Sequence, residues 1–257
     1  FASVIHSCSH TFPYTRLFRS TSGFSVCART TLVHACGGAA ALADVIVLGA
    51  REGRFGKKGE TKSLVPFAAS SIPLVTLGTF FLWFGWFGFN GFSQLAMGTF
   101  DDVTAITKIA VNTHLAGAAG VVTGAVVTRL LDSKTDVVMM LNGALAGLVA
   151  ITAEPLTPTP GMALVIGSIG SLIMYFGTKF LERMGLDDVV GAIPVHMFAG
   201  IFGTLIVPLT NADTSFGSQF TGVIAVCSFS FILSFIIFKT LIATVGLRIS
   251  QDVERLG

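Results

Sequence analysis

Apolar and polar positions alternate along the chain in long blocks, and the apolar blocks have the length of membrane-spanning helices. Seven blocks with almost no charge stand out, over residues 31–50, 70–97, 103–129, 136–153, 161–180, 189–208 and 217–245. A helix needs about 20 residues to cross a hydrocarbon core of about 30 Å. The pattern predicts an all-α polytopic membrane protein with about seven transmembrane helices, surrounded by membrane lipid.

Composition supports this class and excludes others. Charged residues make up 12% of the chain and hydrophobic residues 52%, whereas soluble domains carry about 25% charged residues. The net charge of +2 comes from basic residues between the apolar blocks, so no nucleic-acid partner is predicted. The four cysteines, Cys8, Cys27, Cys36 and Cys227, have neither metal-site nor redox spacing. No metal, cofactor or disulfide framework is therefore expected.

Charge in the connections predicts an orientation. Connections around 98–102, 154–160 and 209–216 contain no Lys or Arg, and the acidic residues on this side are Asp101, Asp102, Glu154 and Asp213. The alternate connections and the end of the chain are basic, with Arg51, Arg54, Lys57, Lys58, Lys62, Arg129, Lys134, Lys179, Arg183, Arg248 and Arg255. Basic connections usually face the cytoplasm. The sequence thus predicts a plasma (inner) membrane protein with a cytoplasmic C-terminus.

Two histidines lie in apolar spans and in matching contexts. His34 in "LVHACGGAA" and His196 in "PVHMFAGIF" share the pattern V-H-x-x-[G/A]-G. An ionisable side chain in such a span usually faces a protein-lined path. Weak internal sequence similarity of this kind can indicate a transporter built from inverted repeats. Because the first and sixth spans run in opposite directions, we expect the two histidines to meet at mid-depth.

A pair of imidazoles suits a small polar molecule better than a bare cation. Each neutral ring offers one donor and one acceptor nitrogen, so the pair can bind such a molecule or relay a proton. It lacks the ring of oxygen ligands that replaces the hydration shell of potassium. A substrate that can lose its charge at the entrance is expected to pass.

The second span carries an aromatic stretch, "FLWFGWFGFNGFSQ". Trp86, Phe89 and Ser93 follow i, i+3, i+7 spacing and are expected to share one helical face. Such a stripe often serves packing alone. Near the outer end of a pore it would also attract a cation through its ring faces, with Ser93 as a polar partner.

Taken together, the motifs resemble the Amt branch of the Amt/Mep/Rh ammonium transporter family. The matching pieces are "VHACGGAA", "GTFFLWFGWFGFNGFS", "NGALAGLVAITA" and "DDVVGAIPVHMFAGIFGTL". The resemblance implies an eleven-helix fold with an inverted five-plus-five repeat, a homotrimer, and one pore in each subunit. It assigns this chain to the C-terminal part only, from the fifth to the eleventh helix.

The resemblance also implies roles for single residues. His34 and His196 match the family's twin histidines in the pore, and Phe89 matches one of two stacked phenyl rings at the outer entrance. Ser93 matches a hydroxyl of the outer vestibule, and Trp86 is similar to a family tryptophan with a less direct role. An acidic pair at a helix start, Asp187 and Asp188, is expected to satisfy backbone donors.

The chain departs from the family pattern at both ends. The family's first four helices are absent, and residues 1–30 form an unassigned, atypical segment in which Val26 replaces an acidic residue. Phe92 stands where the family generally has glycine. Residues 31–250 are expected to form the partial transporter domain, and 251–257 the start of a cytoplasmic tail.

The predicted function is transport of ammonium or ammonia through a twin-histidine pore, without enzymatic catalysis and with a cytoplasmic regulatory protein as a candidate partner. One alternative is an ammonium sensor built on a transporter body. The other is a membrane cytochrome in which His34 and His196 are the axial ligands of a haem.

Overall fold

The structure is a computed structural model that describes residues 30–55, 67–250 and 253–254. The described part is helical, with no strand among its residues. In chain order its elements are the π-helix η1 (Thr31–Ala35), α3 (Cys36–Leu48), α4 (Ile72–Gly91), the 3₁₀-helix η2 (Phe92–Gln94), α5 (Phe100–Leu131), α6 (Val137–Thr152), α7 (Pro160–Met184), the π-helix η3 (Ile193–Phe198), α8 (Ala199–Leu205), the 3₁₀-helix η4 (Val207–Leu209) and α9 (Phe216–Thr244).

Each predicted apolar block coincides with one of these helical runs to within a few residues at either end, which confirms the all-α membrane architecture. Five runs are long and apolar enough to cross a membrane: Thr31–Leu48, Ile72–Gln94, Phe100–Leu131, Pro160–Met184 and Phe216–Thr244. The other two, Val137–Thr152 and Ile193–Leu209, are apolar but shorter. The sixth block is divided into η3, α8 and η4, with Pro194 and Pro208 near the starts of η3 and η4.

Helix α5 begins earlier than its apolar block because of its N-terminal cap. The Thr99 hydroxyl accepts the Asp102 N–H at 3.2 Å, and the Asp102 carboxylate accepts the Thr99 N–H at 3.0 Å. This reciprocal capping box satisfies two backbone donors. Asp101 and Asp102 therefore lie in the first turn of α5. The sequence pattern had predicted that they belong to the connection before this helix.

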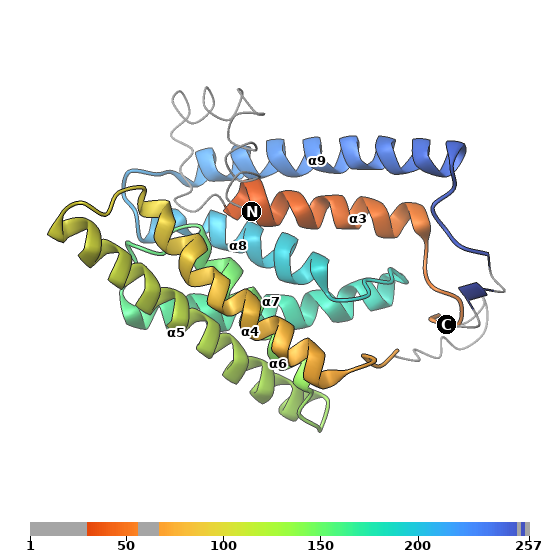
Figure 1. Cartoon of the computed structure of the whole chain (residues 1–257), viewed down its shortest axis with the longest axis horizontal. Coiled ribbons are helices and arrows are strands. Elements are labelled where there is room, and N and C mark those ends of the chain that lie inside the picture. The colour runs from red at the N-terminus through yellow and green to blue at the C-terminus, as the bar shows by residue number, and fades with distance from the viewer. Residues whose placement is uncertain (1–29, 56–66, 251–252, 255–257) are drawn as a thin grey trace.

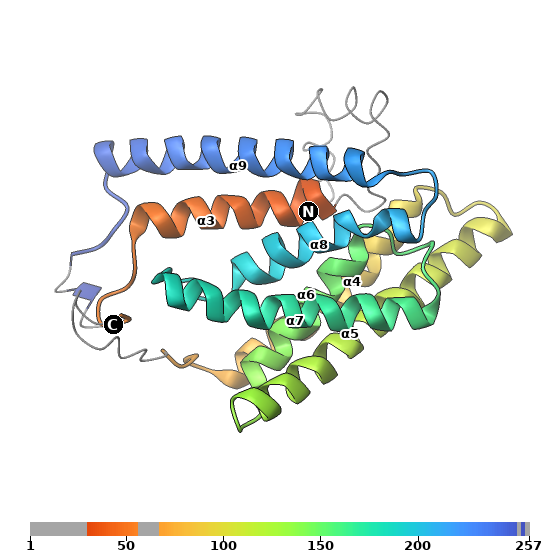
Figure 2. The ribbon, with the colours of Figure 1, turned by 180° about the vertical axis from the view of Figure 1, so that it is seen from behind.

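The helices form two groups that meet at the centre of the molecule (Figures 1 and 2). Helices α3 and α9 lie side by side, and the Ser230 hydroxyl on α9 donates to the Cys36 carbonyl at 2.8 Å. Helices α5, α6 and α7 pack together through small residues, and α4 lies across α5 and α6. The run from η3 to α8 lies between the two groups and is antiparallel to α3. This arrangement brings the first and sixth predicted spans together.

Candidate functional site

The two histidines contact each other where their helices cross. Nδ1 of His34 lies 3.2 Å from Nδ1 of His196. The ring planes are inclined by 13° and their centroids are 5.3 Å apart. His34 is the fourth residue of η1, "TLVHA", and His196 is the fourth residue of η3, "IPVHMF". π-helical turns are rare and occur often at functional sites, so both repeats use the same uncommon backbone to present their histidine.

The glycines of the shared motif explain how the two segments approach so closely. A Cβ on Gly38 would lie 2.5 Å from the backbone nitrogen of Met197, the residue after His196. A Cβ on Gly200 would lie 3.3 Å from the backbone nitrogen of Ala35, the residue after His34. Each motif glycine thus packs against the chain directly after the other repeat's histidine. This reciprocal contact is what an approximate two-fold relation between the repeats requires.

The Nδ1–Nδ1 contact determines which hydrogen-bonding groups the two histidines present to a third molecule. In an Nδ1–H···Nδ1 hydrogen bond between neutral rings, the donor ring has a bare Nε2 and the acceptor ring carries its proton on Nε2. The pair therefore presents one acceptor and one donor nitrogen, whichever ring donates. His34 is 9% exposed, and among the described residues its Nε2 has no hydrogen-bond partner.

Two of the three aromatic-stretch residues reach this pair. The Trp86 ring stacks on the His34 ring at 5.1 Å and 11°, and the Phe89 ring meets the His34 ring edge-on at 5.8 Å. Trp86 is held in place because its Nε1 donates to the Thr152 hydroxyl at 2.7 Å. The family resemblance implied a less direct role for Trp86, and no sequence pattern pointed to Thr152. The N–H group of a buried indole needs a hydrogen-bond acceptor, and the Thr152 hydroxyl is that acceptor here.

Ser93 lies just beyond this cluster. It belongs to the 3₁₀-helix η2, and its hydroxyl donates to the Phe89 carbonyl at 3.0 Å. The helix changes from α to 3₁₀ after Gly91, so Ser93 lies outside the α-helical part of the span. Phe92, the departure from the family pattern, is 76% exposed.

The two aspartates before η3, Asp187 and Asp188, make different contacts. Asp188 satisfies backbone donors as expected: its oxygens accept the N–H groups of Ala192 at 2.9 Å and Ile193 at 2.7 Å. Asp187 instead binds Arg51, which follows α3, through two side-chain bonds of 2.7 and 2.8 Å and one backbone bond of 3.0 Å. Asp187 thereby links the end of the His34 helix to the chain that leads into the His196 helix.

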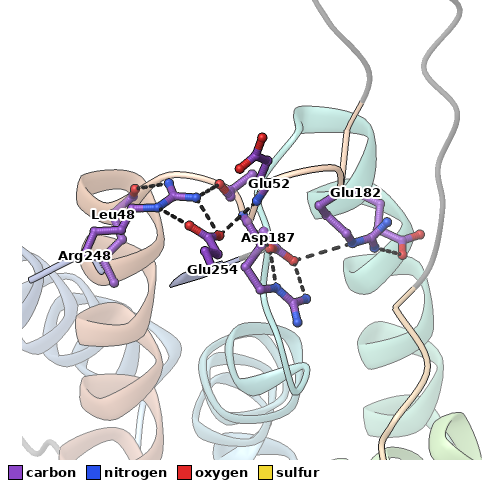
Figure 3. A network of polar contacts seen from close by, with 9 residues as sticks. Leu48, Glu52, Glu182, Asp187, Arg248 and Glu254 are labelled. Atoms are coloured by element: carbon purple, nitrogen blue, oxygen red, sulfur yellow. Dashed lines mark hydrogen bonds and ion pairs between the residues drawn. The ribbon is translucent and has the colours of Figure 1, made fainter. Parts of the chain in front are cut away.

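A larger polar network surrounds this link (Figure 3). Arg248, which follows α9, donates to the Leu48 and Ala50 carbonyls at 3.1 and 2.9 Å. It also binds Glu254 at 2.8 Å, and Glu254 accepts the Glu52 N–H at 3.0 Å. The orphan carbonyls at the end of α3 are thus capped by a cation, as the helix dipole favours.

Electrostatics at Asp187 favour its charged form. Burial alone would raise the pKa of the Asp187 carboxyl, but the hydrogen bonds from Arg51, with the charges of Arg51 and Arg54, outweigh it and hold that pKa below its ordinary value of 3.8. The folded state therefore gains stability above the unfolded pKa. That gain is lost as the pH falls through the folded pKa.

Substituting Arg51 is expected to destabilise the protein by about 2 kcal/mol at neutral pH, because the Asp187 carboxylate, whose side chain is 2% exposed, would lose its hydrogen-bonded cation and keep only the longer ion pair with Arg54 at 3.5 Å. The measurement is unfolding of Arg51→Met and wild type in detergent from pH 7 to about pH 3, where the difference should shrink below about pH 4. Lys179→Met is the control. Lys179 pairs with Asp132 at 3.3 Å through side chains that are 37% and 34% exposed, so its loss should stay below about 1 kcal/mol. Equal losses in both variants would contradict the assignment.

A third histidine in a membrane span, His114, did not stand out in the sequence. It lies on α5, is exposed, and contacts Trp83 at 5.5 Å and Phe87 at 6.1 Å between ring centroids. It has no counterpart of the V-H-x-x-[G/A]-G context and is not part of the paired site.

Comparison with known proteins assigns the chain to a family. The model of the Ammonium Transporter Family matches residues 15–257. The chain belongs to this family. The match begins before residue 31, the expected start of the transporter domain, and residues 1–29 lie outside the described part of the structure.

Relatives of this ammonium transporter family member agree in sequence and in fold. Ammonium transporter Amt2 of Archaeoglobus fulgidus is 39% identical over 247 residues, which cover 88% of this chain and 51% of the relative. A solved structure described as a sensor Amt protein matches with a TM-score of 0.85 and 33% identity, over 94% of this chain and 60% of that one. Candida albicans Mep2 matches with a TM-score of 0.80 and 28% identity, over 92% and 55%. The chain spans about half the length of the curated relatives it matches.

The geometry of the paired histidines does not support the haem alternative. The two axial ligands of a haem iron lie on opposite sides of it at about 2 Å each, so their coordinating nitrogens are about 4 Å apart. His34 and His196 are at hydrogen-bond distance instead, with their rings stacked.

Proposed function

We propose that this chain forms part of an ammonium transporter in which His34 and His196 line the pore at mid-depth. One observation carries the proposal. Two antiparallel helices bring the histidines into Nδ1–Nδ1 contact at 3.2 Å, and the buried His34 Nε2 has no partner among the described residues. An unpaired polar atom in a membrane protein's interior is costly unless it serves a substrate.

The geometry supports a path that carries ammonia and proton separately. Moving an isolated ammonium ion into a low-dielectric interior costs on the order of tens of kcal/mol, so the ion sheds its proton near the entrance. Neutral ammonia then donates to the bare Nε2 and accepts from the protonated Nε2 as it passes the pair. The shared Nδ1 proton lets the two rings exchange tautomers, which relays a proton along the same route.

Phe89, Trp86 and Ser93 form the outer part of the proposed path. The Phe89 ring lies next to His34, so moving Phe89 would change access to the pair. Its ring face would attract the arriving cation. Trp86 supports the His34 ring from the side, and Ser93, one turn beyond Phe89, is the polar group at the mouth.

We also propose that the protein is a homotrimer in the plasma (inner) membrane, with residues 31–250 as its membrane domain and 251–257 at the start of a cytoplasmic tail. The basic residues Arg51, Arg54 and Arg248 gather in one network, as the positive-inside rule expects of the cytoplasmic side. That end is where a cytoplasmic regulatory protein would bind.

The sensor alternative remains the second candidate. Its support is the likeness to the solved structure described as a sensor Amt protein. A signalling module encoded after Gly257 would favour it over a dedicated transporter.

Uptake measurements test the proposal directly. The protein expressed from its complete coding sequence, in cells without their own ammonium transporters, should take up labelled methylammonium. Excess ammonium should compete, and excess potassium should not, because the path offers no oxygen cage for a dehydrated cation. Background uptake by protein shown to be in the membrane, or strong competition by potassium, would overturn the proposal.

A further inference from the structure

An open groove of about 430 Å³ lies on α5, and neither paired histidine is among the residues that line it. Its apolar wall includes Phe100, Val103 and Val111 on α5, with Pro160 at the start of α7. Phe100 is 85% exposed, and Val103 and Val111 are 46% and 45% exposed. The groove follows α5 for about three turns from its N-terminal end.

A single cation, Lys108, stands in the wall of this groove. It is exposed and lies eight residues inside a helix that the composition marks as membrane-spanning. Among the described residues no carboxylate forms an ion pair with it. Asp101 stands two turns nearer the helix start, and the Asp102 carboxylate is taken up by the cap and by Gln94. A lysine within a span calls for an anionic partner.

The depth of Lys108 suits the phosphate layer of a bilayer. Helix α5 has 32 residues and is about 48 Å long, more than the hydrocarbon core of about 30 Å. Its ends therefore extend into the headgroup layers. Helix α5 lies oblique to α3 and α9 (Figure 1), which reduces the length by which it exceeds the hydrocarbon core. The Lys108 side chain covers the remaining distance to the headgroup layer. Helical side chains lean toward the N-terminus, and a long one can carry its charge to the interface.

We propose that this groove binds an anionic phospholipid, with its phosphate at Lys108 and an acyl chain along the part of the wall formed by Val111 and Pro160. The groove places a positive charge next to an apolar wall, and an anionic phospholipid presents a negative headgroup next to apolar chains. The Thr104 and Thr107 hydroxyls donate to their own helix at 2.9 and 2.8 Å, so Lys108 supplies the charge recognition. This proposal requires only that the chain spans a membrane, and is independent of transport.

Native mass spectrometry of the complete protein tests this by counting bound phosphatidylglycerol and phosphatidylcholine and by reporting the oligomeric state. Lys108→Met should weaken phosphatidylglycerol binding about fivefold, the effect of one cation at an anionic headgroup layer, and leave phosphatidylcholine binding unchanged. Lys108→Arg should retain wild-type binding. Thr104→Phe, which keeps the cation but fills the groove, should weaken binding of both lipids.

Lys134→Met is the matched control, because Lys134 is an exposed lysine beyond the opposite end of the same helix. It should leave the preference for phosphatidylglycerol intact. Equal losses from Lys108→Met and Lys134→Met would show a general surface-charge effect and overturn the site. Unchanged lipid binding in Lys108→Met with a smaller oligomer would assign the groove to a second copy of the chain, and would also overturn it.

Discussion

Leucine in place of His196 is expected to reduce ammonium uptake about a hundredfold or more while the protein remains folded and inserted. Leucine fills a comparable volume but offers neither donor nor acceptor. Ammonia would then pass the narrowest polar point without its hydrogen bonds, and the His34 Nδ1 would lose the partner that now lies 3.2 Å away. Leaving buried polar groups unpaired costs about 3 kcal/mol, which corresponds to about a hundredfold in rate.

The chain provides its own control for this prediction. His114 is also an imidazole in a membrane span, but it is exposed on α5 and packs against Trp83 and Phe87. His114→Leu should therefore keep near wild-type uptake. His34→Leu should match His196→Leu, because either change destroys the same Nδ1–Nδ1 contact. Wild-type rates and selectivity in both paired variants would refute the role proposed for the pair.

A carboxylate at either position should have a different effect from leucine. It keeps polar atoms in the path and adds a negative charge, so His196→Glu is expected to conduct while admitting potassium more readily. The measurement is uptake of labelled methylammonium with and without potassium in excess. Potassium competition that is as weak in His196→Glu as in wild type would count against charge exclusion at the pair.

Much of this site could be predicted from the sequence, because its signals are local. The shared V-H-x-x-[G/A]-G context marks His34 and His196, and it distinguishes them from His114, which also lies in an apolar span. Charge alternation between the spans gave their opposite directions, from which the meeting of His34 and His196 was expected. Family membership, the helical membrane architecture and the position of each apolar run are confirmed by the comparisons and the structure. The roles of the site residues stay predictions.

What the sequence did not reveal depends on tertiary contacts. Both histidines lie in π-helical turns, and nothing in "TLVHA" or "IPVHMF" distinguishes a π-turn from an α-turn. The stacking of Trp86 on His34 depends on Thr152, which is 66 residues away and holds the indole N–H. Asp187 and Asp188 are neighbours of one residue type, and only the folded position of Arg51 separates a cap from an ion pair.

The close packing of α5, α6 and α7 depends on a joint where three small residues meet. A Cβ on Gly120 would collide with the Gly143 carbonyl oxygen. A Cβ on Gly143 would lie 2.6 Å from both the Gly120 carbonyl oxygen and the Ser171 hydroxyl. That hydroxyl donates to the same Gly120 carbonyl at 2.9 Å. Because lipid gives helices no hydrophobic reason to associate, this close backbone approach is what holds the three together.

Adding one methyl group at this joint, by Gly143→Ala, is therefore expected to destabilise the protein by about 3 kcal/mol. Helix α6 has to move away from rigid backbone on α5, and the displaced Ser171 hydroxyl loses its buried acceptor. The measurement is thermal unfolding of the complete protein in detergent. Gly161→Ala makes the same chemical change at the start of α7, where a Cβ would meet nothing within 4 Å. It should be neutral or stabilise the protein by up to about 1 kcal/mol, since alanine favours the helix. If the two variants unfold at the same temperature, the joint does not hold the three helices together.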